Sequence, residues 1–145
     1  MRHTLSALLL LAVLSALCLM APVPARAATY PMAGVWFGTG QPNDRSEMYI
    51  DYFNADGSFH NQHRECRQGK IASEIKETGR WSVKGDMLSI DIATVNGTPD
   101  PRTDLYRLIA VDAKSQNYVY LRTNFAYHAH KVAGDFAMPP CDLTS

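Results

Sequence analysis

The 145-residue sequence lacks several features that would point directly to a function. It has only three cysteines, and its 14 basic residues are balanced by 14 acidic ones. No basic block occurs, nor any stripe of Lys and Arg interleaved with aromatic residues, so nucleic-acid binding is not expected. Beyond its N-terminus the chain shows no long repeat, no low-complexity tract and no clear amphipathic helix. These absences leave a small β protein as the class to consider.

The one long apolar run lies at the N-terminus. A short polar start precedes about 16 apolar residues, fewer than the ~20 that a membrane-spanning helix needs. The run is followed by Ala25-Arg26-Ala27, in which small residues flank a cleavage point. We therefore expect residues 1–27 to be a cleaved signal peptide. Residues 28–145 should form one periplasmic or secreted domain with no transmembrane span.

Export affects the interpretation of the cysteines. Cys18 lies inside the apolar leader and is expected to leave with it, so Cys66 and Cys141 remain. An even number of cysteines in an oxidising compartment favours a disulfide. A Cys66–Cys141 bond would close a loop of roughly 75 residues and stabilise the fold by about 4 kcal/mol in the chain-entropy model. Two free thiols, which could bind a metal, are the alternative.

In the rest of the chain, hydrophobic and polar residues alternate over short runs, which is typical of half-buried strands. Turn signals such as Asn54-Ala55-Asp56-Gly57 and Lys84-Gly85-Asp86 separate the runs. Asn96 to Pro101 is predicted to be the longest surface loop. The runs cover residues 34–40, 48–52, 59–66, 71–75 (the weakest), 79–83, 88–92, 105–111, 118–123 and 125–132.

We count about eight strands joined by short connections. Sequential hairpins of that number can close on themselves and so remove exposed sheet edges. The prediction is an all-β fold, a single small up-and-down antiparallel β-barrel with room for at most one small ligand. An open sandwich is the rival fold, but it requires a long crossover connection that the sequence does not show.

Three segments resemble the lipocalin-like (calycin) group of barrels. Gly34-x-Trp36 is similar to the Gly-x-Trp signature of that group. The segment from Phe53 to Phe59, and Gly79-Arg80-Trp81 ahead of Gly85, resemble patterns in small bacterial lipocalin-like domains. The resemblance implies that the first tryptophan closes one barrel end beneath a basic residue from a late strand, for which Arg122 is the candidate. Structural signature residues are then Gly34, Trp36 and Trp81, with both tryptophans in the core.

The longer pattern Gly34-x-Trp36-x-Gly38-x-Gly40 is similar to the start of nitrobindin-type haem barrels. That resemblance implies a histidine ligand near the C-terminus, where His128 and His130 stand. These two residues share one face of a strand and could also bind a metal, but zinc needs three or four ligands. His60 and His63 fall on opposite faces of their strand. We therefore predict no cofactor, with His128 and His130 as the alternative haem or metal site.

The sequence offers little support for catalysis. No Gly-x-Ser-x-Gly motif occurs, and the cysteines are better explained as a disulfide. Asp51, Asp91 and Asp104 alternate with apolar residues and should therefore face solvent. We predict that the protein is not an enzyme.

Aromatic residues supply the candidate ligand site. Tyr118 and Tyr120 share one strand face with Arg122. Facing inward, they would form an amphipathic lining for a ligand with an acidic or polar head; facing outward, they would form a patch for a protein partner. The predicted ligand-binding residues are Tyr52, Tyr118, Tyr120, Arg122 and Tyr127.

The predicted function is non-catalytic binding of a small apolar or amphipathic molecule by an exported barrel. Two alternatives stay open. One is a protein-interaction or envelope-associated module with a filled barrel. The other is a haem or metal protein that uses the histidines of the last strand.

Overall fold

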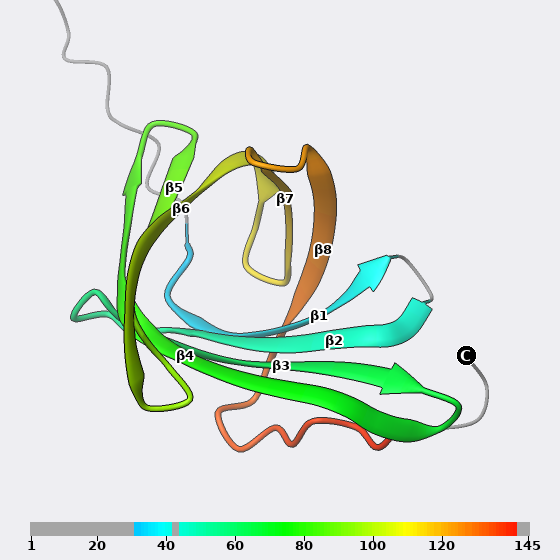
Figure 1. Ribbon diagram of the computed structural model, residues 1–145. Coiled ribbons are helices and arrows are strands. Elements are labelled where there is room, and N and C mark those ends of the chain that lie inside the picture. Colours follow the sequence, from blue (N-terminus) through cyan, green and yellow to red (C-terminus); the bar gives the residue numbers. More distant parts are fainter. Residues whose placement is uncertain (1–30, 42–43, 142–145) are drawn as a thin grey trace, which may run out of the picture.

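The computed structural model describes residues 31–41 and 44–141. The expected signal peptide, residues 1–27, lies outside these ranges. Within them the chain forms eight antiparallel strands and no helix, and the strands close into one barrel in the order β1 to β8 (Figure 1). The strands are β1 Gly34–Gln41, β2 Asp44–Phe53, β3 Ser58–Arg67, β4 Lys70–Lys84, β5 Met87–Val95, β6 Thr98–Val111, β7 Ser115–Tyr120 and β8 Phe125–Val132.

The all-β, up-and-down barrel predicted from the strand pattern is confirmed. Every strand pairs with its successor, and β1 pairs with β8 from Val35↔Val132 to Thr39↔His128, which closes the cylinder. In Figure 1, β1 to β4 lie together in a lower layer, and β5 to β8 arch over it. A sheet closed in this way has no continuous free edge.

Two predicted boundaries are wrong. Residues 71–75 and 79–83 belong to one long strand, β4, which pairs with β3 along its first part and with β5 from Glu77 onward. The expected loop from Asn96 to Pro101 is instead a tight turn, because Asn96 and Gly97 adopt positive φ values of 49° and 80° and β6 begins at Thr98.

The two prolines in that segment explain the second error. Pro99 and Pro101 lie in the first half of β6, while β7 pairs with β6 only from Tyr106 onward. The first half of β6 therefore has a strand neighbour on one side only. Proline is tolerated on such an edge because its missing N–H need not interrupt a hydrogen-bonded ladder.

The core inside the barrel is built around Trp36. This side chain is 0% exposed, and its indole nitrogen donates a hydrogen bond to the Met32 carbonyl oxygen at 2.7 Å. The Lys131 ammonium lies 5.2 Å from the centre of the indole ring and donates to the Ala33 carbonyl oxygen at 2.8 Å. The basic residue over Trp36 is thus Lys131 and not Arg122, because Lys131 stands opposite Trp36 in the β1–β8 register.

Trp81 packs less deeply than Trp36. Its ring meets the ring of Phe53 edge-to-face at 5.4 Å, and its indole nitrogen donates to the Asn54 carbonyl oxygen at 2.9 Å. Gly34 has a φ of 137°, and a Cβ atom there would run into the Lys131 side chain.

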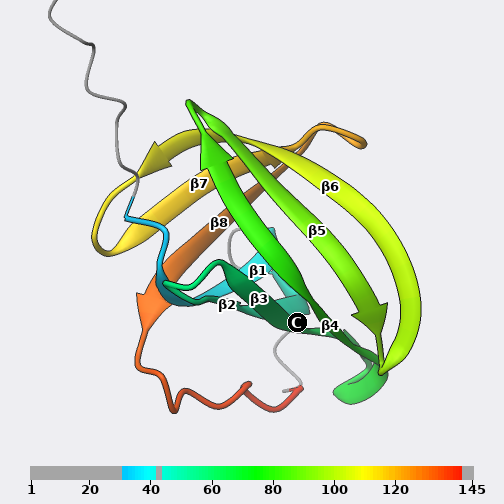
Figure 2. The ribbon, with the colours of Figure 1, turned by 90° about the vertical axis from the view of Figure 1, so that its left-hand side faces the viewer.

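A second hydrophobic cluster lies on the outer side of β1 to β3. Phe37, Met48 and Ile50 are buried there beneath the segment that follows β8, which contributes Phe136 and Met138. Figure 2 shows this segment running along the outside of the barrel after β8. The barrel therefore has two hydrophobic layers, one inside the cylinder and one between β1–β3 and the C-terminal segment.

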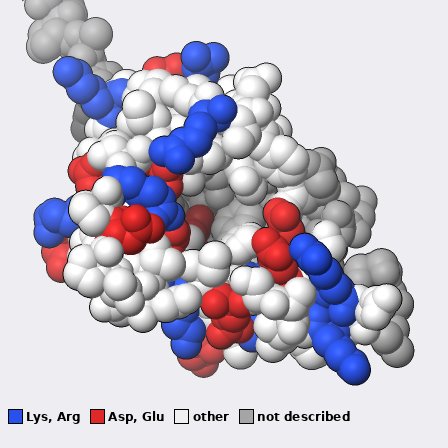
Figure 3. Space-filling model, viewed as in Figure 1, with Lys and Arg blue, Asp and Glu red and all other residues white. Residues whose placement is uncertain are grey.

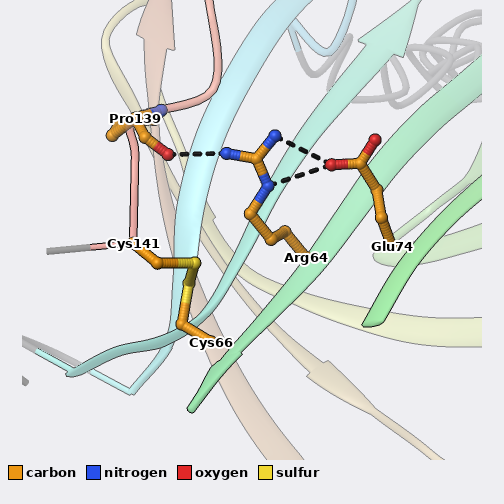
Figure 4. Close-up of a disulfide and its surroundings, with 5 residues drawn as sticks. All are labelled: Arg64, Cys66, Glu74, Pro139 and Cys141. Atoms are coloured by element: carbon orange, nitrogen blue, oxygen red, sulfur yellow. Dashed lines mark hydrogen bonds and ion pairs between the residues drawn. A yellow bond between two sulfur atoms is a disulfide. The ribbon is translucent and has the colours of Figure 1, made fainter. Parts of the chain in front are cut away.

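The predicted Cys66–Cys141 disulfide is confirmed and fastens this segment to β3 (Figure 4). Arg64 adds a second attachment. Its guanidinium donates to the Pro139 carbonyl oxygen at 2.8 Å, and to Glu74 on β4 at 2.8 and 2.9 Å. A disulfide is consistent with an oxidising compartment.

No helix in the described part of the chain is long and apolar enough to cross a membrane.

Candidate functional site

A cavity of about 260 Å³ lies within the barrel. Figure 3 shows that the molecule is hollowed on the face seen in Figure 1, with acidic and basic side chains at the margin of the hollow. The cavity lining is rich in tyrosines and charged groups, in contrast to the mostly apolar lining that is usual for small-molecule sites. It consists of Tyr49, Asp51, Asn61, His63, Ile75, Glu77, Arg102, Asp104, Tyr106, Tyr118, Tyr120 and Tyr127.

Strand register arranges part of this lining in layers. Asp51, Asn61 and Glu77 stand directly opposite one another across β2, β3 and β4 and form a polar layer. Phe53 follows Asp51 by two residues on β2, and it pairs with Phe59, which precedes Asn61 by two residues on β3. A smaller chamber of about 30 Å³ reaches down among these two rings and the side chains of Leu88, Ile90 and Ile92. The cavity thus has a polar middle and an apolar floor.

Five tyrosines form a continuous aromatic wall on β2, β6, β7 and β8. The ring of Tyr118 stacks on that of Tyr127 at 5.5 Å, and the ring of Tyr106 stacks on that of Tyr120 at 4.9 Å. Tyr106 also meets Tyr118 edge-to-face at 5.5 Å, and Tyr49 meets Tyr127 in the same way at 5.8 Å. These contacts hold the rings in fixed orientations, because offset-stacked and edge-to-face aromatic pairs are both favourable geometries.

The glycine at position 38 makes room for one member of this wall. A Cβ atom at Gly38 would clash with the ring of Tyr49 and would lie 2.7 Å from the His128 carbonyl oxygen. The Tyr49 hydroxyl donates to that same carbonyl oxygen at 3.3 Å. The glycine-rich first strand therefore lets the Tyr49 side chain cross β1 and reach β8.

Burial keeps the tyrosine hydroxyls protonated. It raises the pKa of Tyr49, Tyr106 and Tyr118 well above the usual value, and nearby carboxylates such as Asp51 raise it further. Burial, together with the hydrogen bond to Asp104, raises the pKa of Tyr120 to about 12. The wall therefore offers neutral hydroxyl groups at physiological pH.

The prediction that Asp51 and Asp104 face solvent is wrong. Asp51 is 6% exposed and Asp104 is 7% exposed, whereas Asp91 is exposed as expected. Polar and apolar residues alternate around these two aspartates as predicted, but the face that carries the aspartates points into the barrel and not toward solvent. On β2 the apolar residues Met48 and Ile50 point outward because the C-terminal segment covers them, so the polar residues on the other face point into the barrel.

Arg102 neutralises part of this buried acidity. Its guanidinium forms ion pairs with Glu77 and with Asp100, and its Nε lies 3.4 Å from Asp104. Asp104 also accepts a hydrogen bond from the Tyr120 hydroxyl at 2.7 Å and lies 3.4 Å from the guanidinium of Arg122. Glu77 and Asp104 therefore both have cationic partners.

Asp51 is in a different position. Burial, and after it the charge of Glu77, raises the pKa of Asp51 to about 7. Hydrogen bonds from Asn61 and from the Tyr118 hydroxyl, 3.5 Å away, oppose this rise without cancelling it. Asp51 is thus poised between its neutral and ionised forms near neutral pH.

The structure brings together three of the five predicted ligand-binding residues. Tyr118, Tyr120 and Tyr127 line the cavity. Arg122 lies at its margin with a side chain that is 63% exposed, 5.8 Å from the centre of the Tyr120 ring. Tyr52 does not line the cavity. It follows Asp51 in an alternating strand and therefore points outward, where it stacks on His60 at 4.1 Å.

The histidines do not converge. His63 lines the cavity, whereas His60 is exposed on the other face of β3. His128 and His130 share the outer face of β8, where His128 hydrogen-bonds Asn117 at 2.5 Å and His130 meets the ring of Phe37. Among the side chains that the structure describes, those of residues 31–40 and 46–141, no three His, Cys, Asp or Glu are grouped so that they could hold a metal ion.

Several lining residues were not predicted from the sequence. Tyr49, Tyr106 and Arg102 were not singled out, although each lies two or four residues from another lining residue on the same strand. That spacing is the signal that could have found them, because side chains two apart on a strand share a face. Neither a family model nor a curated protein matches the chain.

Proposed function

We propose that this protein is an exported, non-catalytic, lipocalin-like barrel that binds a small amphipathic molecule in its cavity. The observation that carries the proposal is the two-zone lining, in which a polar, tyrosine-rich middle lies above an apolar floor. A ligand with a polar head and an apolar body matches both zones. A cavity of about 260 Å³ lies just under the usual range of roughly 300–1,000 Å³, which indicates a ligand at the small end of that range.

Two further features support the proposal. Tyr118 and Tyr120 line the cavity, which supports a role in ligand contact over a role in an outer patch for a protein partner. The Cys66–Cys141 bond supports a periplasmic or secreted location, in agreement with the apolar leader. The carboxylates of the cavity are held by Arg102, Arg122, Asn61 and tyrosine hydroxyls, which suits a binding role.

Native mass spectrometry tests the proposal. The protein is purified from cells that express and export the full chain, and the spectrum is searched for a non-covalently retained small molecule. We expect an adduct that disappears in Ile75→Trp, because Ile75 lines the cavity and a larger side chain would fill it.

The matched control is Ile71→Trp. Ile71 lies on the same strand, is 54% exposed and does not line the cavity, so the adduct should persist. An adduct that survives in both variants would place the bound molecule elsewhere. No adduct, together with no thermal stabilisation by a panel of small amphipathic compounds, would overturn the proposal.

A further inference from the structure

Inside the cavity, one carboxyl group lacks a counter-charge and one neighbouring amide oxygen lacks a hydrogen-bond donor. Among the residues whose side chains the structure describes, 31–40 and 46–141, no Lys, Arg or His lies within ion-pair distance of the Asp51 carboxyl group. The Asn61 Oδ1 atom is buried and has no hydrogen-bond partner. Asp51 and Asn61 stand directly opposite each other in the β2–β3 register, so both acceptors lie at one point of the polar layer.

Leaving such groups unmatched is costly. A buried acceptor without a partner loses its hydration without compensation, and a buried charge without a counter-charge costs more. Other buried polar groups of the cavity are matched, since Glu77 and Asp104 pair with Arg102. The unmatched pair is therefore the place in the cavity where a ligand would gain most by donating hydrogen bonds.

The charge of the lining favours a cation there. Three carboxylates, Asp51, Glu77 and Asp104, face one guanidinium inside the cavity, with Arg122 adding a second at the exposed margin. When all of these groups are ionised, the acidic charges outnumber the basic ones. An anionic ligand head would be repelled, whereas a cationic head would supply the counter-charge that the Asp51 carboxylate lacks.

The aromatic wall favours the same class of ligand. Tyr118 lies beside Asp51, and its ring stacks on Tyr127 and meets Tyr106 edge-to-face. Faces of aromatic rings attract ammonium groups through their quadrupole. A neutral polyol could use the hydroxyl groups, but it would leave Asp51 without a counter-charge.

Resting on the proposed function, we infer that the ligand is a small primary or secondary amine with an apolar body. Its protonated nitrogen donates to Asp51 and to Asn61 Oδ1 beside the Tyr118 ring. The apolar body reaches toward the floor formed by Phe53 and Phe59. An N–H-bearing ammonium fits better than a quaternary one, because Asn61 Oδ1 needs a donor.

Calorimetric titration at pH 8 with four matched compounds tests the inference. They are 2-phenylethylamine, its N,N,N-trimethyl derivative, 2-phenylethanol and 3-phenylpropionate. We expect 2-phenylethylamine to bind about ten-fold or more tightly than 2-phenylethanol, since a hydrogen bond to a charged group contributes about 1.5–3 kcal/mol. The trimethyl derivative should bind less tightly than the amine, and 3-phenylpropionate should bind least.

Two variants locate the effect. Asp51→Asn should abolish the preference for the amine over the alcohol, because the amide keeps the shape of the carboxyl group but carries no charge. Asp91→Asn is the matched control, since Asp91 is exposed on the outer side of β5. It should leave the preference unchanged.

The outcomes separate the inference from the proposed function. If the alcohol or the carboxylate binds as tightly as the amine, or if Asp51→Asn keeps the preference, the amine assignment is overturned while the cavity still binds ligands. If none of the four compounds binds, the amine assignment is also overturned. The proposed function is then decided by the retained adduct and its loss in Ile75→Trp.

Discussion

The hydroxyl group of Tyr118 lies 3.5 Å from Oδ2 of Asp51, although β8 and β1 separate β7 from β2 around the barrel. The contact crosses the interior of the cylinder, where both side chains are almost completely buried. A polar interaction at this depth links residues that are 67 positions apart in the chain. It marks the interior as a polar site enclosed by hydrophobic layers.

The first prediction concerns the pH dependence of stability. The folded-state pKa of Asp51, about 7, is raised from 3.8 in the first place by burial, so the folded protein binds more protons than the unfolded chain between these values. The contribution of Asp51 to stability is therefore fully present below about pH 4 and is lost as the pH rises through about 7. Between pH 5 and pH 9 the loss is about 3 kcal/mol.

Urea unfolding of the wild type and of Asp51→Asn at these two pH values measures this loss. The stability of the variant relative to the wild type should increase by about 3 kcal/mol from pH 5 to pH 9, because the amide has no charge to bury. Asp91→Asn should show no such change, since Asp91 is exposed. Parallel pH profiles for the wild type and Asp51→Asn would contradict the prediction.

The second prediction concerns Gly38. In Gly38→Ala the new methyl group forces the Tyr49 ring or the β8 backbone to move, which should cost about 1–3 kcal/mol, as overpacking commonly does. The displaced ring should also weaken binding of 2-phenylethylamine, measured by calorimetry. Gly134→Ala is the control, because a methyl group at that position would meet no other atom within 4 Å. Equal stabilities of the two variants would refute the role given to Gly38.

The third prediction concerns Trp36. Trp36→Ala should lower the free energy of unfolding by about 3–5 kcal/mol, because it leaves a cavity in the inner core and removes the hydrogen bond to Met32. Trp36→Phe keeps most of the buried ring and should cost clearly less. Chemical denaturation followed by circular dichroism measures both. A loss below about 1 kcal/mol in Trp36→Ala would be incompatible with its burial.

The fourth prediction concerns the disulfide. Reduction of Cys66–Cys141 should lower stability by about 4 kcal/mol, because the bond closes a loop of 75 residues in the unfolded chain. Thermal unfolding with and without dithiothreitol measures the effect. The double variant Cys66→Ser, Cys141→Ser should melt at the same temperature with or without the reductant. Titratable thiols in the non-reduced protein would count against the bond.

The barrel could be predicted from the sequence because its strands carry local signals. Alternation of polar and apolar residues has the period of a strand whatever surrounds it, and Asp56-Gly57 and Lys84-Gly85 are turns by their own backbone preferences. The prediction for residues 98–101 was wrong because proline is a loop signal in isolation. Proline is acceptable there only because β7 does not extend along the first half of β6, which leaves that edge of the strand without a hydrogen-bonded neighbour.

The site could be predicted only in part. Tyr118, Tyr120 and Tyr127 were found because they alternate on two adjacent strands. Asp51 and Asp104 were placed on the wrong side because alternation separates two faces without saying which one lies inside. Tyr52 was misplaced for the same reason.

The local structure follows from the sequence alone: strands of period two, turns where Gly and Asn allow positive φ, and two cysteines available to pair. Which face of each strand became the interior depended on packing between distant parts of the chain. On β2 that choice depends on the C-terminal segment, which covers Met48 and Ile50 from outside and is held by Cys141. Burying these apolar side chains beneath the segment turns Asp51 inward, so a distant part of the chain sets the chemistry of the cavity.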